Sequence, residues 1–120
     1  MLTENDIARI SRRIVDAYRP IALGIFGSYA TGLAVDRSDL DVFVIKETSE
    51  RPERRARAVQ RLLFGILHPI EVHIFTPAEF EETAYDLLSF TWVIARQARL
   101  YYWTEAANKL VPSLMLRPLG

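Results

Sequence analysis

Three short apolar runs alternate along the chain with segments in which apolar residues recur at helical spacing. The runs at 21–26, 39–45 and 70–75 predict strands. The middle run is apolar on both faces after its opening acids, which is typical of a central strand that is covered on both sides. A helix is predicted between Thr3, whose side chain can cap it, and Pro20, which ends it. Its apolar stripe consists of Ile7, Ile10, Ile14, Val15 and Tyr18.

A basic amphipathic helix is predicted after the second strand. Thr48 or Ser49 can begin this helix, and Pro52 suits its first turn. The buried stripe of the helix is formed by Ala56, Val59, Leu62, Leu63, Ile66 and Leu67. The same segment carries five arginines, which are Arg51, Arg54, Arg55, Arg57 and Arg61. The arginines indicate either a solvated face or a docking surface for an acidic partner or a nucleotide.

The last third of the chain contains further helix signals. Thr76 can cap a helix because a proline and a glutamate follow it at suitable positions. A longer helix is predicted over 84–98, and a short extended segment follows at 100–103. We therefore divide the chain into a domain at 1–103 and a C-terminal tail at 104–120. The tail is expected to be helical to about residue 111 and then irregular, and to be a possible docking segment for a partner.

Composition limits the classes of function. The 120 residues suffice for one domain, and fifteen basic residues balance fifteen acidic ones. A protein that grips nucleic acid through its backbone is usually basic, so direct binding of nucleic acid is not expected. The chain has no cysteine, which excludes disulfides and thiolate metal sites. Neither a signal peptide nor a membrane span is recognisable, and a cytoplasmic location is expected.

The segment with the most chemical information begins where the first strand ends. Gly27 and Ser28 follow that strand, and after ten intervening residues come Asp39 and Asp41. A glycine lets the backbone approach a phosphate closely, and a serine offers both a hydroxyl and an amide N–H. Two carboxylates two residues apart on a strand point to one face. Because paired carboxylates are costly without a counter-ion, Mg²⁺ is their expected partner.

This arrangement resembles the signature of minimal nucleotidyltransferases, which belong to the DNA polymerase β-like superfamily. The resemblance covers about residues 5–103. It implies an α/β (α+β) nucleotidyltransferase fold, with a small mixed central sheet flanked by helices. The family pattern includes a third carboxylate on a later strand, for which Glu71 is the best candidate. Many members also carry an arginine in the turn after Gly-Ser, where this chain has Tyr29 to Gly32.

The resemblance also implies roles for these residues. Asp39, Asp41 and Glu71 would be catalytic and would bind two Mg²⁺ ions, with Mn²⁺ as a possible alternative. Glu71 could in addition accept the proton of the attacking hydroxyl. Gly27 and Ser28 would hold the phosphates of the nucleotide, which is expected to be ATP. His73 shares a face with Glu71 and is expected to be packed or hydrogen-bonded in the sheet rather than catalytic.

Three functions remain open at this point. The resemblance first suggests the antitoxin of a toxin–antitoxin pair, which transfers AMP from ATP to a tyrosine of a HEPN-family toxin. A second reading is transfer of a nucleotide to a small molecule of the antibiotic type, in which a homodimer could build the acceptor site. A third reading is a binding module that neutralises its partner without catalysis. Nothing in the motif holds an acceptor, and this absence favours a separate protein partner.

Overall fold

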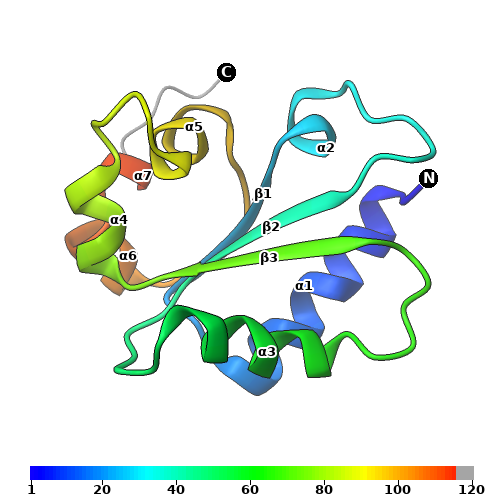
Figure 1. Ribbon diagram of the computed structural model, residues 1–120, viewed down its shortest axis with the longest axis horizontal. Helices are drawn as coiled ribbons and strands as arrows, with labels where there is room; N and C mark the ends of the chain where they lie inside the picture. The colour runs from blue at the N-terminus through cyan, green and yellow to red at the C-terminus, as the bar shows by residue number, and fades with distance from the viewer. Residues whose placement is uncertain (116–120) are drawn as a thin grey trace.

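A mixed four-stranded sheet forms the centre of the structure, a computed structural model that describes residues 1–115 (Figure 1). The strands lie in the order β3-β2-β1-β4, with β1 antiparallel to both of its neighbours and β2 parallel to β3. This arrangement confirms the predicted fold class. Their bounds are β1 (Ala22–Phe26), β2 (Leu40–Ile45), β3 (Ile70–Phe75) and β4 (Arg99–Trp103).

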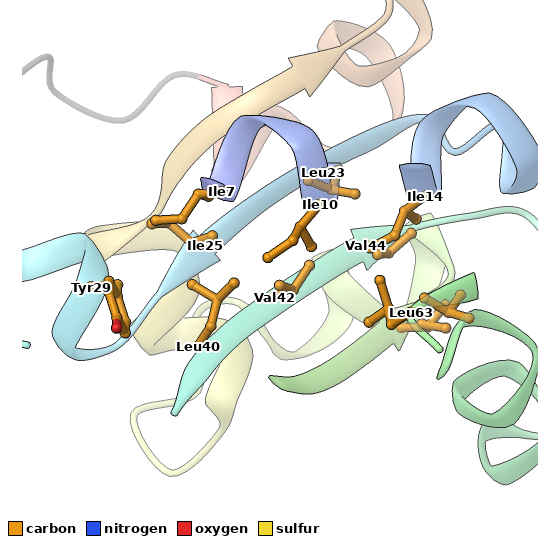
Figure 2. Packing of buried hydrophobic residues seen from close by; sticks show 12 residues of the cluster. Ile7, Ile10, Ile14, Leu23, Ile25, Tyr29, Leu40, Val42, Val44 and Leu63 are labelled. Atoms are coloured by element: carbon orange, nitrogen blue, oxygen red, sulfur yellow. The ribbon is translucent and has the colours of Figure 1, made fainter. Parts of the chain in front are cut away.

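One face of the sheet is covered by α1 (Glu4–Tyr18) and α3 (Pro52–Leu62). The predicted cap of α1 is confirmed, because the Thr3 hydroxyl accepts the Asp6 N–H and the Asp6 carboxylate accepts the Thr3 N–H. Figure 2 shows the apolar side chains of α1 lying on those of β1 and β2. The cluster includes Ile7, Ile10, Ile14, Leu23, Ile25, Leu40, Val42 and Val44. At fifteen residues, α1 is the longest helix in the described part of the chain, and none there suits a bilayer span.

The other face is covered by α4 (Pro77–Thr83), α5 (Phe90–Gln97), α6 (Glu105–Leu110) and α7 (Pro112–Met115). These helices bury Phe43 and Ile45 of β2 completely. Asp41 belongs to the same face of β2 but is only half-buried. The helices therefore cover one end of this face and leave the end with the acids accessible (Figure 1).

The segment predicted as a tail contributes to this second core. Ala107, Val111 and Leu114 are fully buried beside residues of β1, β2 and α5. Helix α6 agrees with the helix expected to about residue 111, whereas α7 adds a further short turn of helix. The irregular end beyond residue 115 lies outside the described residues. The boundary at residue 103 and a docking role for 104–120 stay predictions.

The prediction of one helix over 84–98 is wrong for residues 84–89, which connect two separate helices. Helix α4 ends at Thr83, and α5 begins only after Ser89. The reason is a competing helix cap: the Ser89 hydroxyl oxygen accepts the Trp92 N–H at 3.2 Å, and the hydroxyl donates to the Thr83 carbonyl at 2.6 Å. Tyr85 and Leu88 are exposed in the connecting loop.

Helix α3 differs from its prediction in where it begins and in the environment of Arg55. The helix begins at Pro52, and its capping position is occupied by Arg51 instead of Thr48 or Ser49. Arg55 is neither solvated nor part of a docking surface, because its side chain is only 6% exposed. Its guanidinium donates to both carboxylate oxygens of Glu79, at 2.7 and 3.2 Å, and to the Glu50 carbonyl at 2.7 Å. This pair joins α3 to the start of α4 across the edge of β3.

Replacing Arg55 is expected to destabilise the fold. Arg55→Ala should lower the free energy of unfolding by about 2–3 kcal/mol, because Glu79 loses its bidentate partner and the alanine leaves a cavity. Arg54→Ala is the matched control, since Arg54 is exposed on the same helix, and it should change stability by less than about 0.5 kcal/mol. Urea unfolding of both variants measures the difference. Equal effects would mean that the Arg55–Glu79 pair contributes little.

Candidate active site

The five candidate residues gather at one end of the sheet. Strand β1 runs antiparallel to β2, so the end of β1 lies beside the starts of β2 and β3. Phe26 at the end of β1 pairs with Asp41, and Asp41 in turn pairs with Glu71 on β3. Gly27 and Ser28 follow directly after β1 and begin α2 (Ser28–Thr31). The pairing therefore brings the Gly-Ser turn and the carboxylates together.

Asp41 and Glu71 form the centre of the site. In-register partners on neighbouring strands point to the same face, and here donor atoms of Asp41, Glu71 and His73 all lie within 4.8 Å of one another. Burial first, and then the adjoining carboxyl of Glu71 and the charge of Asp39, together raise the pKa of Asp41 to about 6. A bound cation would stabilise the negative charge that this environment disfavours. The oxygen and nitrogen atoms of this group therefore fit a divalent metal ion.

Gly27 is required by its contact with Asp41. Its φ of +74° lies in the region that side-chain-bearing residues rarely adopt. A Cβ atom at this position would lie 2.5 Å from the Asp41 Oδ2 atom, which is far inside van der Waals contact. The absence of a side chain at Gly27 therefore lets the Asp41 carboxylate lie directly against the turn, where the phosphate contact is predicted.

Asp39 occupies a different position from the other two acids. It precedes β2 by one residue, because the strand begins at Leu40 and not at 39 as predicted, and its side chain is exposed. Asp39 is not a member of the group whose donor atoms lie within 4.8 Å, which in residues 1–115 comprises Asp41, Glu71 and His73. Its charge is nevertheless close enough to raise the pKa of Asp41.

His73 lies beside the acids, although the sequence predicted only packing or hydrogen bonding in the sheet for this residue. Its Nε2 atom is 3.8 Å from the Glu71 Oε2 atom, and its ring packs edge-on against Phe26 at 5.2 Å between ring centroids. Phe90, the first residue of α5, packs against the other rings at 5.4 Å from His73. Burial lowers the pKa of His73 although Glu71 opposes this, which favours the neutral imidazole.

Only part of this arrangement was visible in the sequence. The spacing of Glu71 and His73 places both on one face of β3, and the packing of His73 in the sheet was predicted. The sequence did not predict that Phe90 lies near the site, because the predicted helix over 84–98 includes Phe90 as an interior residue. The Ser89 cap is the signal that could have placed Phe90 at a helix start.

Tyr29 stands in the turn where many related sequences carry an arginine, and its role is structural. The side chain is buried, with 7% of the residue exposed. The Tyr29 hydroxyl accepts the Leu2 N–H at 3.1 Å, and the ring packs edge-on against His68. This tyrosine ties the N-terminus of the chain to the Gly-Ser turn and offers no positive charge to a phosphate.

A hollow beside α1 does not coincide with the acids. It has a volume of about 610 Å³ and is lined by α1 and the loop before β3, including Ile10, Leu67 and His68. None of Asp39, Asp41 and Glu71 lines it. Since a carboxyl group with a raised pKa, that of Asp41, and the Gly27 turn lie at the acidic end of the sheet, we place the candidate site there rather than in the hollow.

Comparison with known families agrees with the fold. The family model described as "Nucleotidyltransferase domain" matches residues 7–99, and the chain therefore belongs to this family. A search of curated proteins gave no match. The family is typically metal-dependent, which is consistent with the group formed by Asp41, Glu71 and His73.

Three solved structures share the fold at low sequence identity. A crystal structure of the toxin–antitoxin MntA-HpeT with two Asp-to-Glu substitutions has 17% identity and a TM-score of 0.59, covering 96% of this chain and 86% of that one. A Tyr-to-Ala mutant of MntA-HpeT has 17% identity and a TM-score of 0.57, with 97% and 86% covered. A toxin–antitoxin with AMP-PNP has 18% identity and a TM-score of 0.52, with 96% and 86% covered. Similarity at this level establishes the fold alone.

Proposed function

We propose that this protein transfers AMP from ATP to a tyrosine of a partner protein, a HEPN-family toxin, and so acts as its antitoxin. Membership of the nucleotidyltransferase family supplies the class of reaction. The observation that carries the proposal is the in-register pair of Asp41 and Glu71 directly beside Gly27. In this arrangement the groups that would bind phosphate lie beside those that would bind a cation, as nucleotidyl transfer requires.

Each residue of the site has a separate role in the proposal. Asp39, Asp41 and Glu71 would hold two divalent cations, either Mg²⁺ or Mn²⁺. Bound there, such ions supply activation of the attacking hydroxyl and neutralisation of the departing diphosphate. Gly27 and Ser28 would hold the phosphates through backbone amides and the serine hydroxyl. Glu71 would accept the proton of the attacking hydroxyl, while the bond from the α-phosphorus to the diphosphate breaks.

The exposure of the acidic residues supports a protein as the acceptor. The side chain of Glu71 is 63% exposed, and Asp39 is exposed as well. No residue of the site offers an obvious grip for a small acceptor. The structural relatives include toxin–antitoxin proteins, one of them with AMP-PNP, an analogue of ATP. These observations support ATP as the nucleotide and a toxin as the partner.

Intact-mass measurement tests the proposal. The protein is incubated with ATP, a divalent cation and the product of the neighbouring reading frame. We expect the partner to gain one or more AMP units on tyrosine, and Asp39→Asn to abolish the gain. Modification of a small molecule alone would indicate an antibiotic-type transferase. Complex formation without any mass change, and equally strong with Asp39→Asn, would indicate a binding module that does not catalyse.

A further inference from the structure

We infer that His73 is itself a metal ligand and that it makes the site select Mn²⁺ over Mg²⁺. The inference rests on the cation site of the proposed function and adds a nitrogen ligand to its carboxylates. Among residues 1–115, Asp41, Glu71 and His73 form the group of potential ligands that lies within 4.8 Å. A nitrogen of His73 therefore lies within 4.8 Å of a carboxylate oxygen of each of the two acids.

The distance between His73 and Glu71 supports shared ligation. Their Nε2 and Oε2 atoms are 3.8 Å apart, which is too long for a hydrogen bond. Two ligand atoms that each lie about 2.1 Å from one ion are separated by roughly 3–4.2 Å, depending on their angle at the ion. The observed separation falls inside this interval, so one cation can contact both atoms with little movement of either side chain.

The surroundings of His73 hold the ring in place. Phe26 packs against the ring from β1, and Phe90 packs against it from the start of α5. Both neighbours are hydrocarbon rings that offer no hydrogen bond to the imidazole. The ring therefore keeps its Nε2 edge beside Glu71 through packing, and a metal ion can use the lone pair of this nitrogen without displacing another partner.

Ligand chemistry gives the expected selectivity. Mg²⁺ prefers an all-oxygen shell and dehydrates reluctantly, whereas first-row transition ions bind imidazole readily. Mn²⁺ accepts carboxylate and water as Mg²⁺ does, and it gains more from a nitrogen ligand. A site with two carboxylates and one imidazole should therefore bind Mn²⁺ more tightly than Mg²⁺, and His73 should account for most of the difference.

Electron spin-echo spectroscopy of bound Mn²⁺ tests the inference without relying on activity. In the wild-type protein, we expect the ¹⁴N coupling of a directly bound imidazole. The coupling should persist in His68→Gln and vanish in His73→Gln. His68 is the matched control because it is the other histidine of the chain and lies outside the acidic group. Titration calorimetry should show that His73→Gln weakens Mn²⁺ binding at least tenfold and changes Mg²⁺ binding less than about threefold.

The outcomes separate this inference from the proposed function. Bound Mn²⁺ without imidazole coupling in the wild type would overturn the inference, and this measurement needs no variant. Equal losses of Mn²⁺ and Mg²⁺ affinity in His73→Gln would also overturn it, because His73 would then act through packing alone. Imidazole coupling without AMP transfer to the partner would support the inference and contradict the proposed function. AMP transfer to the partner without imidazole coupling would support the proposed function and contradict the inference.

Discussion

Asp41→Asn is expected to abolish nucleotidyl transfer and, at the same time, to stabilise the metal-free protein at neutral pH. The loss of transfer should be at least about 1,000-fold, which corresponds to about 4 kcal/mol of transition-state stabilisation. The gain in stability follows from the crowding of Asp41 by burial and by Glu71 and Asp39. Because Asp41 is partly exposed, solvent screening reduces this gain to about 1 kcal/mol. Intact-mass assays and thermal melts in EDTA measure the two effects.

The gain in stability from Asp41→Asn should depend on pH. The pKa of Asp41 is about 6 in the folded protein, above its ordinary value, so the folded state binds a proton more readily than the unfolded state. The charged carboxylate therefore destabilises the fold fully above pH 6, and this penalty disappears as the pH falls towards about 4. Melts of the variant and the wild type should differ at pH 7.5 and converge near pH 4.

Asp36→Asn is the matched control for this prediction. Asp36 lies in the loop before β2, and its side chain is 91% exposed. Its replacement should leave both the transfer and the pH dependence of stability close to those of the wild type. Millimolar Mg²⁺ or Mn²⁺ should stabilise the wild type and Asp36→Asn but not Asp41→Asn. Identical metal responses in all three proteins would contradict the placement of the cation site at Asp41.

Gly27→Ala is expected to remove most of the activity and, unlike Asp41→Asn, to destabilise the protein. The new methyl group would overlap the Asp41 carboxylate, which must leave its place against the turn. The backbone conformation, with φ +74° and ψ −154°, is in addition almost restricted to glycine. Together these effects should lower the free energy of unfolding by about 2–3 kcal/mol and the rate of transfer at least 100-fold.

Gly32→Ala separates the effect of the contact with Asp41 from the effect of backbone strain. Gly32 also has a positive φ, +81°, but a Cβ atom there would meet nothing within 4 Å. This variant should lose about 1 kcal/mol of stability from backbone strain and keep its activity within about threefold. Urea unfolding and intact-mass assays compare the pair. If Gly32→Ala were as inactive as Gly27→Ala, the contact between Gly27 and Asp41 could not explain the loss.

The strands and the first helix could be predicted because their signals are local. The apolar runs at 21–26 and 70–75 match β1 and β3 to within one residue, and the Thr3 cap is present as predicted. The break between α4 and α5 was missed although its signal is equally local. Apolar periodicity continues across residues 84–89, and it was given more weight than the Ser89 cap.

The environment of Arg55 could not be predicted from its own helix. Five arginines in eleven residues indicate a solvated face, and four of them are exposed as this pattern suggests. Arg55 is buried because Glu79, twenty-four residues away, lies at the start of α4 beside it. Neither helix by itself shows that this contact exists.

The sequence by itself determined the family, the fold class and the acids at the starts of two strands. These follow from residue types at fixed spacing and from periodicity, which are properties of neighbouring residues. Only the tertiary structure decided that Gly27 lies against Asp41 and that Asp41 pairs with Glu71. It also decided that the ring of Phe90 packs against that of His73 beside them. Those contacts depend on strand register and helix placement, which are set by the packing of residues distant in the chain.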